Sequence, residues 1–133
     1  MSGFDWDVDR NDAAAARFLT QSTFGPTLPA IAELRRVGVE AWIDQQIALP
    51  VTRHIPWLEQ IDGSGDDVYQ NVRQEAWFRR ALYGDDQLRQ RIAFALSEIV
   101  VVSDRGTLVG SPWMLAGYYD MLLEDAFGNY RDL

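Results

Sequence analysis

Apolar residues recur every three or four positions along most of this sequence, which is the spacing of one face of an α-helix. Glycine and proline interrupt the pattern at several points, and these residues typically end one helix or precede the next. The sequence therefore predicts an all-α fold, an irregular array of six to seven helices. The predicted helices cover residues 13–23, 28–37, 39–48, 54–61, 67–83, 87–102 and 112–126.

We expect the helix over about 87–102 to lie at the centre of this array. Leu88, Ile92 and Leu96 fall on one broad face, because successive residues of an α-helix are about 100° apart. Further apolar side chains occupy most of the remaining circumference, and a helix that is apolar nearly all round is usually buried. Residues 99–102 leave an alternative open, because this run is β-branched, is disfavoured in a helix interior and could form a strand.

Capping residues support several of the boundaries. Asn11 or Asp12 can cap the first helix and Thr27 the second, because their side-chain oxygens accept hydrogen bonds from free helical amides. Gly38 separates the second and third helices.

The chain of 133 residues is long enough for one domain.

The predicted organisation is a polar N-terminal segment, residues 1–11, followed by a helical domain, residues 12–133. The first segment is rich in aspartate, with Phe4 and Trp6 as candidate anchors onto the body. It has no apolar stretch of the kind that a signal peptide needs, so a cytoplasmic location is the default expectation.

The net charge of the chain and the length of its apolar runs limit the kinds of partner that it can bind. The chain carries 12 basic residues, all arginine, and 20 acidic ones, a formal net charge of −8. Binding a nucleic-acid backbone requires a local excess of cations, and a membrane-spanning helix requires roughly 18–20 apolar residues. We therefore expect a protein partner, with no nucleic acid and no membrane span.

Motifs for metal binding and catalysis are missing. Cysteine is absent and His54 is the one histidine, which argues against disulfides, zinc–thiolate sites and histidine-rich metal centres. The sequence has no G-x-S-x-G elbow, P-loop or dinucleotide fingerprint. We expect no metal, no cofactor, and no enzyme activity from this stretch by itself.

The most distinctive charged residues are Arg91 and Glu98 in the predicted central helix. They lie within roughly 20° of each other around the helix axis. A buried unpaired charge costs several kcal/mol, so each must reach solvent, find a partner or line a polar cavity. One interpretation is a set of structural ion pairs to neighbouring helices. The other is a polar site lined by Arg89, Arg91, Ser97 and Glu98.

Five tryptophans suggest a further possibility, a glycan- or anion-binding surface of tryptophan and arginine. However, Trp42, Trp77 and Trp113 lie in apolar helical stripes, and such stripes more often belong to a core.

Four blocks of sequence carry a family resemblance. They are residues 15–26 (AARFLTQSTFGP), 38–46 (GVEAWIDQQ), 88–103 (LRQRIAFALSEIVVVS) and 127–133 (FGNYRDL). In this order and spacing they resemble the N-terminal part of a bacterial family known as domain of unknown function 1800. The resemblance extends from about Asp12 to Leu133.

The resemblance implies a mainly helical protein of unknown activity. Members are several hundred residues long, often exported, and often encoded beside a second uncharacterised family, so this chain resembles their first quarter to third. Some members carry Trp-His-Asn-His-Phe where this sequence reads Leu96-Ser97-Glu98-Ile99-Val100. If those histidines bind a metal or act as acid or base in such members, this chain cannot do so in the same way, because it has no histidine at these positions.

The function expected from these observations is that of a non-catalytic N-terminal helical module of a larger protein, with a structural or protein-interaction role. Its partner would be the rest of that polypeptide or a second chain. The alternatives are part of an enzyme site lined by Arg91 and Glu98 and completed elsewhere, or the tryptophan–arginine surface.

Overall fold

The structure is a computed structural model that describes residues 11–131. Within that range the chain forms seven α-helices and no strand, which confirms the all-α prediction. The predicted segment 1–11 lies outside the described residues except for Asn11. The helices are α1 (Asp12–Ser22), α2 (Leu28–Val37), α3 (Val39–Ala48), α4 (Ile55–Gly63), α5 (Gln70–Tyr83), α6 (Gln87–Ser97) and α7 (Pro112–Glu124), with a short 3-10 turn, η1 (Gly106–Leu108), before α7.

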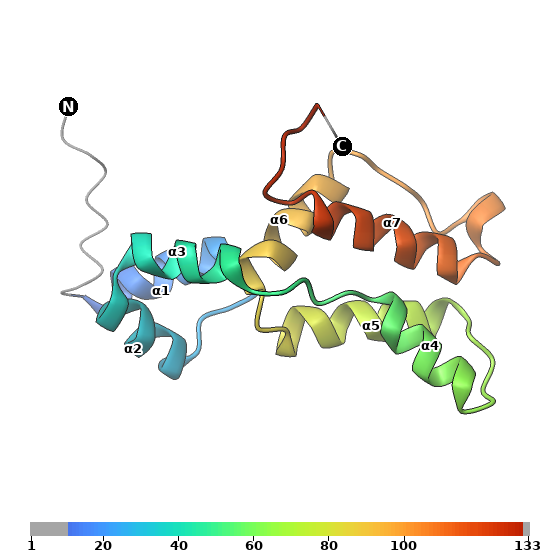
Figure 1. Ribbon diagram of the computed structural model, residues 1–133, viewed down its shortest axis with the longest axis horizontal. Helices are drawn as coiled ribbons and strands as arrows, with labels where there is room; N and C mark the ends of the chain where they lie inside the picture. The colour runs from blue at the N-terminus through green and yellow to red at the C-terminus, as the bar shows by residue number, and fades with distance from the viewer. Residues whose placement is uncertain (1–10, 132–133) are drawn as a thin grey trace.

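Helices α1, α2 and α3 form one group, drawn in blue to teal in Figure 1. The side chain of Asn11 accepts a hydrogen bond from the amide of Ala13 at 2.8 Å, and that of Thr27 accepts one from Ala30 at 3.2 Å. Gly38 has a φ of +84°, a conformation that favours glycine, and it turns the chain directly from α2 into α3. The buried core of this group consists of Ala14, Ala15, Phe18, Leu19, Leu34 and Trp42.

Helices α4, α5 and α7 form a second group, at the other end of the molecule in Figure 1. Each of the three contacts the other two. Leu58, Val72, Ala76 and Ala116 form the buried core between them. None of the helices in the described part of the chain has both the length and the apolar character needed to cross a membrane.

Helix α6 lies between the two groups. It contacts α1 and α3 on one side and α5 and α7 on the other, and Figure 1 shows it at the middle of the molecule. The predicted central position of this helix is confirmed.

The predicted length of the central helix is wrong. Helix α6 ends at Ser97, residues 98–100 form a turn, and residues 101–103 have no regular structure. The strand alternative for residues 99–102 is not realised either. β-Branched side chains are disfavoured in a helix, and here no packing compensates, because Ile99 is 66% exposed and Val101 is 74% exposed.

The predicted all-round apolar burial of this helix is also wrong. Leu88, Ile92 and Leu96 are only half-buried and Ala95 is exposed. Three of the four buried side chains of α6 are polar: main-chain carbonyl groups of neighbouring segments accept hydrogen bonds from Arg89 and Gln90, and a carbonyl group of α6 itself accepts one from Ser97. The buried residues are Arg89, Gln90, Ala93 and Ser97.

Candidate functional site

The connection between α3 and α4, residues 49–54, passes α6 in Figure 1. Buried polar side chains of α6 and α7 form hydrogen bonds with this connection. Burying a polar group is unfavourable unless it is hydrogen-bonded, so the partners of each residue indicate its role. We call the following five residues, each less than one-tenth exposed, the polar junction: His54, Asp86, Arg89, Gln90 and Asp120.

Asp120, on α7, binds the beginning of α4. Its Oδ1 accepts a hydrogen bond from the amide of His54 at 2.7 Å, and its Oδ2 accepts one from the amide of Ile55 at 3.0 Å. Residue His54 stands at the N-cap of α4 and makes no side-chain cap bond of its own. The first amides of a helix have no partner within the helix, and a carboxylate there is favourable. Asp120 thus caps α4 from another helix.

Asp86 and Gln90 bind the same connection at Thr52, two residues before His54. Asp86 Oδ2 accepts a hydrogen bond from the amide of Thr52 at 2.9 Å, and Gln90 Nε2 donates to the carbonyl oxygen of Thr52 at 2.9 Å. Together they satisfy both main-chain groups of Thr52, as a neighbouring strand would.

Arg89 is a buried cation whose partners are main-chain carbonyl groups. Its guanidinium donates to the carbonyl oxygen of Leu123 at 3.1 Å and to that of Ile47 at 3.3 Å. These carbonyls belong to the last turns of α7 and α3, where the helix dipole is negative. The guanidinium also lies 4.5 Å from the centre of the Phe127 ring. Arg89 therefore joins two helix ends in place of forming an ion pair.

The other three residues of the predicted polar site, Arg91, Ser97 and Glu98, contact different parts of the molecule. Arg91 Nε donates to the carbonyl oxygen of Gln21 at 3.4 Å, at the end of α1. Ser97 Oγ donates to the carbonyl oxygen of Phe94 at 2.7 Å. Glu98 is exposed at the C-cap of α6. Arg89 faces α3 and α7, so the structure does not bring these four side chains to one point.

His54 was given no role by the sequence, yet it is part of the junction. Its Nδ1 lies 2.9 Å from Asp120 Oδ1, and because a carboxylate only accepts hydrogen bonds, Nδ1 carries the proton. Nε2 is buried and has no partner among the described residues. The ring packs edge-on against Tyr119, with 5.6 Å between ring centres.

A histidine oriented by aspartate can act as a general base only if a substrate atom can reach its free nitrogen. A cavity of about 400 Å³ between α4 and α7 is lined by Glu59, Asp120 and Glu124 among others, but not by His54. A second cavity, of about 600 Å³, lies beside α2 and the end of α5 and does not include His54 either. The geometry favours a structural role for the His54–Asp120 pair.

The sequence contained one signal for this junction. Asp120 interrupts a run of large apolar and aromatic residues, Tyr118-Tyr119-Asp120-Met121-Leu122-Leu123, and a carboxylate on such a helix needs a partner. Across the described residues, no three His, Asp or Glu side chains are placed to hold a metal ion.

Of the tryptophans in the described part of the chain, only Trp113 is exposed. Trp42 is 6% exposed, Trp57 and Trp77 are half-buried, and Trp113 is 37% exposed. Trp6 lies outside the described residues.

Comparison with known protein families identifies a match over most of the chain. The family described as "Protein of unknown function (DUF1800)" matches residues 17–133. No curated protein and no solved structure matches the chain.

Proposed function

We propose that this chain, which belongs to the DUF1800 family of proteins of unknown function, is a non-catalytic helical module. Its role is to pack against another protein surface, namely a later part of a longer polypeptide. The observation that supports this most directly is an apolar surface that the described fold leaves exposed.

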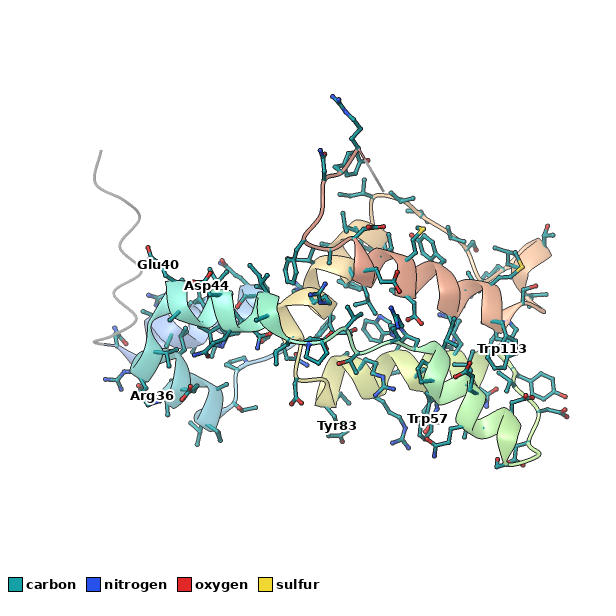
Figure 2. All side chains as sticks on the ribbon, in the orientation of Figure 1. Arg36, Glu40, Asp44, Trp57, Tyr83 and Trp113 are labelled. Carbon is teal, nitrogen blue, oxygen red and sulfur yellow. The ribbon has the colours of Figure 1, made fainter. Side chains whose placement is uncertain are left out.

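Exposed apolar side chains follow one another along the connection from α6 to α7 and the first turn of α7. Large apolar patches are rare on monomeric proteins and often mark sites of interaction. Along this segment Val101 is 74% exposed and Met114 is 65% exposed. Figure 2 labels Trp113 near the start of α7. We call the set the valine surface: Ile99, Val100, Val101, Val102, Val109, Trp113 and Met114.

The connection is held in place although its apolar side chains are exposed. Arg73, on α5, forms an ion pair with Asp104 at 2.9 Å. The hydroxyl group of Tyr118 donates to the carbonyl oxygen of Val100. Burial raises the pKa of Tyr118, so its phenol remains a protonated donor at neutral pH. A fixed backbone presents the valine surface in one arrangement, which lowers the entropy cost of packing.

The alternative function, part of an enzyme site lined by Arg91 and Glu98, has less support. Arg91 lies against the end of α1, whereas Glu98 is exposed at the end of α6. The buried carboxylates Asp86 and Asp120 accept hydrogen bonds from main-chain amides, which is a structural use of their oxygens.

Val101→Asp tests the proposal in two contexts. In the 133-residue chain the substitution should shift the thermal midpoint by less than about 2 °C, because changes at exposed positions usually have small effects. In a longer protein that contains this chain, it should lower the midpoint by about 5 °C or more, because it places a charge in an apolar contact. Differential scanning fluorimetry measures both values.

Gln74→Asp is the matched control, since it adds the same charge at an exposed position of α5. It should have little effect in either protein. An equal shift for Val101→Asp in both contexts, or no shift in the longer protein, would show that the valine surface is not a packing surface.

A further inference from the structure

A groove of about 600 Å³ lies between the first group of helices and the corner where α5 leads into α6. Ala30 and Trp42 line it from α2 and α3, and Leu82 and Tyr83 line it from the end of α5. Figure 2 labels Tyr83 at this end of α5. The volume is within the range of about 300–1,000 Å³ that is usual for binding pockets.

The side-chain amides in the wall of the groove are already hydrogen-bonded. Gln87 Nε2 donates to the carbonyl oxygen of Gly84 at 2.8 Å, and its Oε1 accepts from the amide of Phe24 at 3.4 Å. Gln46 donates to the carbonyl oxygen of Asp85 at 3.2 Å. The groove therefore offers an occupant mainly apolar contacts.

Exposed apolar side chains line one side of the groove. Leu82 is 63% exposed and Tyr83 is 79% exposed. An occupant with apolar side chains would remove both from water, and this is the main source of favourable free energy in association.

The charged side chains that line the groove are Glu33 and Asp85, and its described lining contains no arginine or histidine. Arg36 forms an ion pair with Glu33 at 2.6 Å and lowers the pKa of that carboxyl by hydrogen bonding. Asp85 is therefore the carboxylate of the groove that is available to a basic partner. Asp85 is exposed and forms no ion pair with the described residues. The chain as a whole also carries a net charge of −8.

We infer that this groove docks a basic, amphipathic segment of a partner protein. Apolar side chains of that segment occupy the groove, and a lysine or arginine lies next to Asp85. This is the groove-binding mode of peptide recognition, with complementary charge at the rim. The groove and the valine surface share no residue, so the inference does not depend on the proposed function.

The test uses the 133-residue chain and a fluorescein-labelled synthetic peptide. The peptide has about 14 residues, leucine and lysine, with the leucines at helical spacing. Fluorescence anisotropy should show saturable binding that weakens with added salt. The matching peptide with glutamate in place of lysine should bind at least about tenfold more weakly.

Two pairs of variants locate the binding. Ala30→Trp fills the groove and should weaken binding at least about tenfold, whereas Ala32→Trp, at an exposed position of the same helix, should not. Asp85→Lys should weaken binding about fivefold, whereas Asp44→Lys, exposed on α3, should not. Should Ala30→Trp fail to fold, Leu82→Glu on the exposed rim takes its place.

The inference is overturned if the lysine peptide does not bind, or if it binds a folded Ala30→Trp or Leu82→Glu variant as tightly as the original chain. Equal binding of the glutamate peptide would overturn the assignment of a basic partner, as would an Asp85→Lys variant with unchanged affinity.

Discussion

At the scale of single residues, Asp120 joins α7 to the beginning of α4. Three donors converge on its carboxylate: the amides of His54 and Ile55 and the imidazole Nδ1 of His54. The sequence indicates that Asp120 needs a partner, because it interrupts an apolar helix. It does not indicate which partner, because His54 lies 66 positions away and the local pattern carries no information about that distance.

Asp120→Ala should be strongly destabilising. It leaves two buried main-chain amides and an imidazole without an acceptor, and each unsatisfied buried group costs about 1–3 kcal/mol. We expect the free energy of unfolding to fall by about 3 kcal/mol or more, measured by urea denaturation followed by circular dichroism.

Glu124→Ala, on the same helix, provides the control. Glu124 forms an ion pair with Arg53 in which both side chains are about half exposed, and exposed pairs contribute about 0–1 kcal/mol. If the two substitutions lowered stability equally, the capping role of Asp120 would be wrong.

At the scale of helices, local signals predicted boundaries better than they predicted buried faces. Asn11, Thr27 and Gly38 act within a few residues of themselves, so their effect on α1, α2 and α3 can be read from the sequence. The faces of α6 could not be predicted in this way. Arg89 and Gln90 are buried because carbonyl groups of distant segments accept their hydrogen bonds, and hydropathy takes no account of such partners.

The packing of α6 against α7 gives a second prediction. Ala93 is 1% exposed and lies in a cluster with Leu122 and Leu123. Ala93→Leu should therefore overpack this contact and lower the free energy of unfolding by about 1–3 kcal/mol. Ala95→Leu, at an exposed position two residues later, should change it by less than about 0.5 kcal/mol. Urea denaturation of the two variants distinguishes them, and similar midpoints would contradict the burial of Ala93.

At the scale of the whole molecule, the two groups of helices are joined through α6 and through the connection at residues 49–54. Polar side chains from α6 and α7 hold that connection by its main chain. The all-α class and the central place of α6 followed from periodicity. The way in which the two groups of helices are joined could not be predicted from periodicity, because it depends on main-chain partners that no pattern of side chains specifies.

Amide hydrogen exchange tests this arrangement directly. The amides of Thr52, His54 and Ile55 donate to buried carboxylates, although Thr52 and His54 lie outside any helix. They should exchange at least about a hundredfold more slowly than the amides of Val101 and Val102, which have no acceptor among the described residues. Nuclear magnetic resonance resolves the individual rates. Similar rates in the two segments would mean that the connection is not held.

The shared connection also limits how such a protein can change during evolution. Asp86 and Asp120 belong to the helices after residue 54, but their donors come from the stretch that follows α3. If those later helices were exchanged for unrelated ones, the amides of Thr52 and His54 would lose their acceptors. A compensating change in the connection would have to accompany such an exchange.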